Sequence, residues 1–420
     1  MSSSDTSRQS ATTPTTSRRW GSERGAVLVQ VAIAFIGLTA FSAFVVDYGV
    51  LWSARRQAQN SADAGAMAAA VSLGFVDATD QNRARNAALD TARTNAIWGQ
   101  PPDITDGDVT FPPCPVGAPG AGTNTCVRVD VFRNQRAGGN PLPTIFGRLV
   151  GVTNQGVRAT ATAEVRYGNS TNCVKPFAIP DKWQELRNNQ GPAGWDLSDS
   201  FERYVQNGNN QGALLNPADV YTAPTNANNG TGFDVTLDYG LQLTIKSGNP
   251  NQALQPGWYA PVIINPACGS GGACYRNAIA QCAPNVIRAG DVLTMEPGNM
   301  VGPTQQGMSS LIALDPTATW SLSANGGRGG ISGGCMSASS SPCALSPRVV
   351  AIPVFDPDAW DRGPSQGRSS VVVTRIIGMF VERMQGNDVV GRLMPYPSSS
   401  YTGTGGVPGS GFVVSIILVR

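Results

Sequence analysis

The sequence of 420 residues contains no histidine, and this absence excludes the commonest catalytic constellations. Without an imidazole there is no Ser-His or Cys-His nucleophile, no histidine general base and no histidine metal ligand. Carboxylates remain, and a pair of them could in principle act on a glycan. No Asp or Glu pair stands out by its spacing, however. We therefore predict no catalytic residue and a protein that is not an enzyme.

Two short motifs resemble ion or phosphate sites, but each lacks a feature that such a site needs. The stretch "DITDGD", residues 103–108, combines carboxylates with a glycine but has neither EF-hand spacing nor a bidentate acid at the twelfth position. The stretch "GGRGGISGG", residues 326–334, lacks the Gly-Lys-Ser/Thr ending of a phosphate-binding loop. We interpret the first as a solvated turn and the second as a surface loop. The sequence thus predicts no metal site and no cofactor.

The spacing of the cysteines favours disulfides over zinc, because no CxxC-type pair is present. An even number of cysteines in a polar, loop-rich region is typical of an oxidising compartment. From proximity along the chain alone, we pair Cys114 with Cys126 and Cys335 with Cys343. Cys173 is then expected to join Cys268, Cys274 or Cys282. The two of these three that remain are expected to join each other. The eight disulfide candidates are Cys114, Cys126, Cys173, Cys268, Cys274, Cys282, Cys335 and Cys343.

An uncharged apolar segment, residues 26–46, precedes every cysteine and contains Gln30 as its only strongly polar residue. As a helix it would reach about 30 Å, the thickness of the hydrocarbon core of a bilayer. A buried core helix is rarely this long and apolar on every face. A signal peptide would have a shorter apolar region followed by a cleavage site and polar chain, whereas this run continues past its small residues. We therefore predict a retained transmembrane helix at residues 25–46.

The charges beside this segment indicate its orientation. Arg18, Arg19 and Arg24, partly offset by Glu23, come just before it, and the first charge after it is Asp47. The excess of arginine predicts a cytoplasmic N-terminus in a single-pass protein of the cell membrane, with a periplasmic or extracellular C-terminal part. An acid at the membrane exit needs no special role, although Asp47 could pair with a cation on a neighbouring subunit.

Small residues recur at helical spacing directly after the span. They lie on one face of a helix that we expect to extend over residues 47–100, until "WGQPPD" stops it. Small side chains let another backbone approach closely, so this face predicts packing against a helix of another subunit. The alternative is that alanine is present only as the best helix former. The predicted packing face consists of Ala54, Ala58, Ala62, Ala66 and Ala70.

The remainder of the chain is predicted to be β-rich. It has 49 Gly, 30 Pro and only 14% charged residues, which suits a fold with many turns. Strands are predicted at "CVRVDVF" and "GVRATATAEVRY", where apolar and polar residues alternate, and at "RVVAIPVFD", "SSVVVTRIIGMFVERM" and "GFVVSIILVR". Residues 1–24 are rich in Ser and Thr and are expected to be a disordered tail. A net charge of +2 gives no footprint for nucleic acid.

The N-terminal stretch "ERGAVLVQVAIAFIGLTAFSAFVVDYGVLWSARRQAQNSADAGAMAAA" resembles the signature of the Tad (tight adherence, Flp) pilus-assembly proteins of the TadE/TadG type, and is most similar to TadG. Shared features are an Arg-Gly boundary, an apolar span, an acid and a glycine at its exit, and an alanine-rich helix. The segments "CVKPFAIPD" and "EPGNMVGPTQQGMSSLIALDP" are similar to TadG-like ectodomains. The matching residues of the signature are Arg24, Gly25, Asp47, Gly49, Arg55, Gln59, Ala62, Asp63, Ala64 and Ala68–Ala70.

This resemblance implies an α+β fold in which a single transmembrane helix continues into a pilin-like α/β module, residues 101–168, followed by a disulfide-stapled, β-rich ectodomain, residues 169–420. It implies a membrane-anchored minor component of a pilus-assembly apparatus, acting through helix packing and ectodomain contacts in pilus biogenesis and adherence. The implied partners are the cytoplasmic membrane and other Tad subunits or pseudopilins. Neither nucleic acid nor a small-molecule substrate is expected.

The chain departs from the family pattern at two places. TadE pseudopilins carry a glutamate where this chain has Gln30, so we expect no cleavage after Gly25. The letters of "DLSDS", Asp196–Ser200, match the metal motif of von Willebrand A domains found in some TadG-like proteins, but they follow the polar "NNQGPAGW" instead of a buried strand. The alternative function is a membrane-anchored, calcium-dependent adhesin or matrix-binding module that uses the Asn/Gly-rich loops of residues 206–232.

Overall fold

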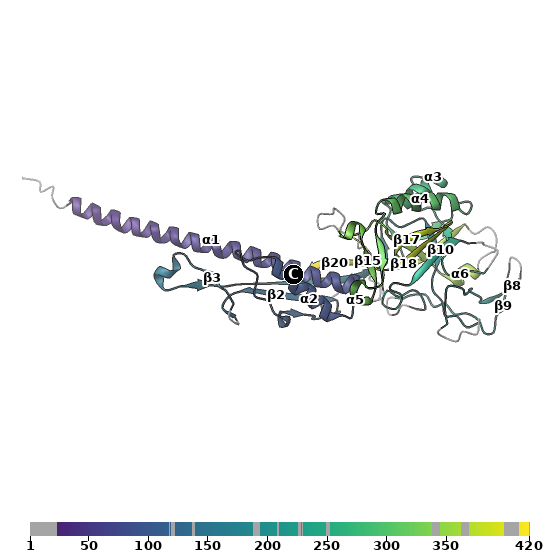
Figure 1. Ribbon diagram of the computed structural model, residues 1–420, viewed down its shortest axis with the longest axis horizontal. Helices are drawn as coiled ribbons and strands as arrows, with labels where there is room; N and C mark the ends of the chain where they lie inside the picture. The colour runs from purple at the N-terminus through teal and green to yellow at the C-terminus, as the bar shows by residue number, and fades with distance from the viewer. Residues whose placement is uncertain are drawn as a thin grey trace, which may run out of the picture.

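The structure is a computed structural model in which one long helix leads into two β-rich modules (Figure 1). It describes residues 23–419 apart from 117, 119–121, 137–138, 188–193, 208–209, 226–227, 229, 249–252, 338–344, 363–368 and 399–410.

Helix α1, Glu23–Phe75, is 53 residues long, and its first half stands free of the rest of the chain (Figure 1). The large apolar side chains between Val27 and Val46 are 42–72% exposed. Within the described part of the chain, α1 is the one helix long and apolar enough to cross a membrane. The predicted N-terminal apolar helix is confirmed, and it fits a single-pass membrane protein.

The helix ends earlier than the sequence predicted. Instead of continuing to about residue 97, the chain turns after Phe75 and forms a second helix, α2 (Gln81–Thr94), which packs against α1. The carboxylate of Asp80 caps α2 by accepting the Arg83 N–H at 2.9 Å. Near the end of α1, a Cβ on Gly74 would lie only 2.9 Å from a methyl group of Val414, so α1 and the sheet beneath it are in direct contact there.

This first sheet contains five strands in the order β1-β2-β5-β20-β19, and the second half of α1 lies across it together with α2 (Figure 1). The alternation that predicted β2 and β5 places one face of each strand in the core, as for Val127, Val129 and Val131, which are fully buried. The strands are β1 (Val109–Thr110), β2 (Cys126–Arg133), β5 (Val157–Gly168), β19 (Tyr396–Pro397) and β20 (Val413–Val419).

Strand β20 comes from the far end of the chain, yet it pairs with the central strand of the first sheet. Its register with β5 is antiparallel and continuous, from Val413 opposite Gly168 to Val419 opposite Thr162. The predicted domain boundary after residue 168 would therefore separate β5 from β20, although the two strands are paired in one sheet. The second module is therefore an excursion of the chain between β5 and β19.

The predicted alanine face is buried, and its covering comes from the same chain. The five alanines from Ala54 to Ala70 are 0% exposed and share a core cluster with Ala88 of α2 and Val129 of β2. At Gly65, an added Cβ would lie 3.2 Å from the carbonyl oxygen of Ala88. The contact is thus close, as small side chains allow, but it is intramolecular. This corrects the expectation that the face packs against a helix of another subunit.

The second module is a closed ring of six strands, because the long strand β17 pairs with both β16 and β18 while β7, β11 and β10 complete the circuit. Helix α4 packs on β17 and β18, and α3 packs on α4. Strands β16 and β17 were predicted from the sequence. The ring strands are β7 (Phe177–Pro180), β10 (Gln242–Ser247), β11 (Trp258–Pro261), β16 (Val349–Phe355), β17 (Ser370–Gln385) and β18 (Asp388–Leu393).

Most of the remaining elements are short. The helices are α3 (Gly272–Ala280), α4 (Val301–Ala313), α5 (Ala324–Gly327), α6 (Pro357–Arg362), η1 (Asp106–Asp108), η3 (Gly147–Val150) and η4 (Gly334–Ser337). The strands are β3 (Leu142–Pro143), β4 (Asn154–Gln155), β6 (Ser170–Thr171), β8 (Tyr204–Asn207), β9 (Asn210–Leu214), β12 (Ile287–Arg288), β13 (Val292–Thr294), β14 (Thr319–Ser321) and β15 (Gly330–Ser332).

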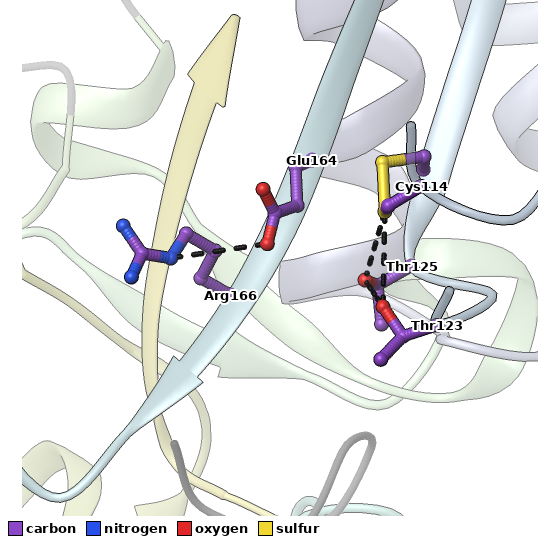
Figure 2. Close-up of a disulfide and its surroundings, with 6 residues drawn as sticks. Cys114, Thr123, Thr125, Glu164 and Arg166 are labelled. Carbon is purple, nitrogen blue, oxygen red and sulfur yellow. Dashed lines mark hydrogen bonds and ion pairs between the residues drawn. A yellow bond between two sulfur atoms is a disulfide. The ribbon is translucent and has the colours of Figure 1, made fainter. Parts of the chain in front are cut away.

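Disulfides join cysteines in both modules. The predicted bond between Cys114 and Cys126 is confirmed, and Figure 2 shows Thr123 and Thr125 beside Cys114. The Thr125 hydroxyl lies 3.4 Å from the Cys114 sulfur, while Glu164 and Arg166 face each other on the neighbouring strand.

The second module contains two more of these bonds. Cys173 joins Cys282, and Cys268 joins Cys274, which is one of the arrangements left open by the sequence. Cys335 is also disulfide-bonded. Its predicted partner Cys343 lies outside the described residues.

We predict that Ala62→Leu destabilises the first module by about 1–3 kcal/mol, because the larger side chain overpacks a fully buried site in the core. Leucine and alanine have similar helix propensities, so the loss reports packing and not helix formation. Denaturant unfolding of the full-length protein in detergent, followed by circular dichroism, measures the change. Asn60→Leu is the matched control, since Asn60 is exposed on the same helix. Equal stability of the Ala62→Leu variant and the wild type would contradict the packing role.

Candidate functional site at the membrane exit

Asp47, the predicted acid at the membrane exit, does not stand alone at the end of the apolar segment. Its carboxylate accepts hydrogen bonds from three consecutive backbone N–H groups, those of Ile145, Phe146 and Gly147, at 2.8, 3.1 and 2.6 Å. In addition, the Gln155 side-chain amide donates to the Asp47 backbone carbonyl at 3.3 Å. The acid thus fastens the loop between β3 and β4 to α1. A cation of another subunit is not needed to compensate its charge.

The loop is folded so that its N–H groups converge on this carboxylate. Residues 144–147 lead into the short helix η3, and Gly151 ends that helix with a positive φ of 87°, a conformation that glycine adopts without strain. The Val152 N–H then donates to the Gly147 carbonyl at 2.9 Å and closes the loop. Successive N–H groups at the start of a helical turn form a site for an anionic oxygen, and here Asp47 occupies it.

The helix carries two exposed aromatic side chains close to Asp47. Tyr48 is 54% exposed and Trp52 is 55% exposed. The Tyr48 ring stacks on Phe44 with 6.0 Å between ring centroids, and the guanidinium of Arg56 lies 5.5 Å from the centre of the Trp52 ring. Tyrosine and tryptophan next to an apolar span are typical of the boundary between membrane and water.

Polar contacts continue the attachment of α1 beyond the aromatic residues. The Gln57 side chain accepts the Trp98 N–H at 2.7 Å, and the Gln59 amide donates to the Thr160 carbonyl at 3.2 Å. At the far end of the helix, Asp77 forms an ion pair with Arg328 of the second module. The glycine-rich loop of residues 326–334 therefore contributes a contact between the two modules.

The other motifs considered in the sequence have local partners. Asp108 of "DITDGD" pairs with Arg136 at 2.6 Å. In "DLSDS", the Asp196 carboxylate accepts both the N–H and the hydroxyl of Ser198, each at 2.6 Å. Among the residues that the structure describes, no three His, Cys, Asp or Glu side chains are placed together as metal ligands.

The loop of residues 144–152 is the part of this site that sequence reasoning missed. Nothing local in the sequence links Asp47 to Ile145, because the two are 98 positions apart and the contacting groups are backbone N–H groups, which every residue except proline carries. The one available signal was "FGRLVG", a helical turn closed by a glycine, which predicts a compact loop but not its partner.

We predict that Asp47→Ala frees the loop, because three backbone N–H donors lose their common acceptor. Hydrogen–deuterium exchange of the full-length protein should show faster exchange in peptides that cover residues 144–152. Asp63→Ala serves as a control on the same helix, since Asp63 contacts Gln59 and not the loop. Unchanged exchange after Asp47→Ala, or an equal effect of both variants, would show that the carboxylate does not hold the loop.

Comparison with known protein families places this site in context. Residues 25–72 match the family model described as "Putative Flp pilus-assembly TadE/G-like". The searches of curated proteins and of solved structures found no match. The matched residues form the apolar half of α1, the exit at Asp47 and the alanine face, and they confirm that the N-terminal segment of this chain is of the TadE/G-like pilus-assembly type.

Proposed function

We propose that this protein is a membrane-anchored minor component of a Tad/Flp-type pilus-assembly apparatus that contributes to pilus biogenesis and surface adherence. The observation that carries the proposal is the division of the family segment within one continuous helix. Its first part exposes apolar side chains on every side, whereas its second part, from Val50 onwards, has one face covered by the protein's own module. A bare apolar surface of this size requires a bilayer or another apolar helix around it.

The arrangement of the first module supports its designation as pilin-like. An N-terminal helix with an apolar first half and a second half laid on a mainly antiparallel sheet agrees with the α/β module that the resemblance implies. Since the alanine face is already covered, contacts with other pilus subunits are assigned to the apolar half of α1 and to the outer surfaces of the two modules. The adhesive role is assigned to the second module, which lies farthest from the membrane segment (Figure 1).

The proposed topology has a cytoplasmic N-terminus and both modules outside the cytoplasm. The arginines before the span support this orientation. Disulfides in both modules support it independently, because such bonds persist in oxidising compartments. The match of the N-terminal segment to a structural pilus-assembly family supports a structural role over an enzymatic one.

We predict that deleting the gene from its host lowers the number of surface pili, and that the full-length chain restores them. A variant with both Leu38→Arg and Phe41→Arg should fail to restore pili and should leave the membrane fraction, because each charge costs about 2.5–3.5 kcal/mol at the centre of a span. Leu237→Arg is the matched control, since Leu237 is 82% exposed on the second module. Normal piliation of the deletion strain would refute the proposal.

We further predict that the Gly25–Ala26 bond remains intact in the mature protein. In a pseudopilin, a glutamate at the fifth position after the cleavage site could neutralise the N-terminal amine of a neighbouring subunit, whereas Gln30 can only form hydrogen bonds. Intact-mass spectrometry of protein extracted from membranes measures the N-terminus. A chain that begins at Ala26 would identify the protein as a pseudopilin and not a permanent anchor.

A further inference from the structure

We infer that the loop of residues 144–152 and the aromatic pair Tyr48 and Trp52 together form a collar around α1 that rests in the phospholipid headgroup layer. This inference rests on the proposed membrane anchoring and adds a second contact with the bilayer. The occupant of the collar surface is the lipid headgroup region, which is continuous with the bilayer around the apolar half of α1.

The depth of the loop follows from its hydrogen bonds. Its backbone at Ile145, Phe146 and Gly147 lies within hydrogen-bonding distance of Asp47, the first residue after the span. One residue of helix rises about 1.5 Å, so the loop lies within a few ångströms of the hydrocarbon edge. The headgroup layer extends about 5–8 Å beyond that edge in each leaflet. The loop is therefore inside this layer and cannot swing away while the three hydrogen bonds persist.

The side chains of the loop suit this layer better than water. Ile145 is 55% exposed and Val152 is 50% exposed, although both belong to a tight, ordered loop that could have presented polar residues. Arg148, between them, is exposed as well. This combination suits the membrane interface, where apolar side chains can contact acyl chains and an arginine can contact lipid phosphates.

The aromatic pair extends the contact to another side of the helix. Trp52 follows Asp47 by five residues, which places it about 7–8 Å farther along the axis and about 140° around it. Its ring therefore reaches the outer part of the headgroup layer on a side of α1 that the loop does not cover. Arg56 over this ring provides a cation at the level of the phosphates. The helix is thus held at one depth from two directions.

A depth measurement on the full-length protein tests the collar. The protein is reconstituted into phosphatidylcholine vesicles that contain phosphatidylglycerol, and a spin label is attached through an unnatural ketone-bearing residue, so that the cysteines stay untouched. Labels are placed at Ile145 and Val152, at Ile36 within the span, and at Leu237 as the water reference. Collision rates with oxygen and with a water-soluble nickel chelate are then compared among the four positions.

We expect nickel collisions at Ile145 and Val152 to be several-fold lower than at Leu237, with oxygen collisions between those of Leu237 and Ile36. Asp47→Ala should shift the Ile145 reading towards that of Leu237 and leave Ile36 unchanged. If both loop labels collide with nickel as freely as Leu237 while Ile36 is shielded, the anchor stands and the collar is refuted. Shielding of the loop labels from both reagents would show that a second protein copy, and not lipid, covers the loop. Free collision of the nickel chelate with the Ile36 label would refute the membrane anchoring itself.

Discussion

The close contact of the second half of α1 with α2 and the first sheet is the interaction on which the rest of the structure depends. Side chains on this face are alanines, and Gly65 has no side chain at all. A Cβ added at Gly65 would lie only 3.2 Å from the carbonyl oxygen of Ala88 in α2. Each alanine removes little apolar surface from water by itself. Their contribution is to let the larger side chains of β2 and β5 reach the helix. This packing joins the apolar half of α1 to the folded module.

The chain connectivity reinforces that junction. Because β20 returns to pair with β5, the whole second module is attached at both ends to the sheet that holds α1. The ion pair between Arg328 and Asp77 adds a third attachment at the end of the helix. Pairing of strands so distant in sequence is slow to form, since a long loop must close first. The first sheet is thus completed only after the second module has been synthesised.

Asp47 marks the transition between the two environments of α1. A carboxylate at the end of an apolar span is costly if it is left without partners, and here three backbone N–H groups compensate it. The same contact brings the loop of residues 144–152 to the end of the apolar segment. In the proposed topology, the position of the helix along the membrane normal is therefore coupled to the folded module.

The sequence by itself determined the features that arise from local composition and period. It was sufficient to predict the apolar segment of residues 26–46, the strands β2, β5, β16, β17 and β20, and the bond between Cys114 and Cys126, because each depends on residues close together in the chain. It also identified the alanine face correctly as one side of a helix, and the TadE/G-like character of the N-terminal segment.

Only the tertiary structure decided what those elements contact. The period of the alanines specifies a face but not its partner, and the covering turned out to be α2 and the protein's own sheet instead of another subunit. The break after Phe75 did have a local signal, because "GFVDATD" is rich in residues that disfavour a helix interior and its last residue caps α2, but the contact of Gly74 with Val414 depends on the fold. The partner of Asp47 was equally hidden, because backbone N–H groups carry no sequence signature and are brought to the carboxylate solely by the fold.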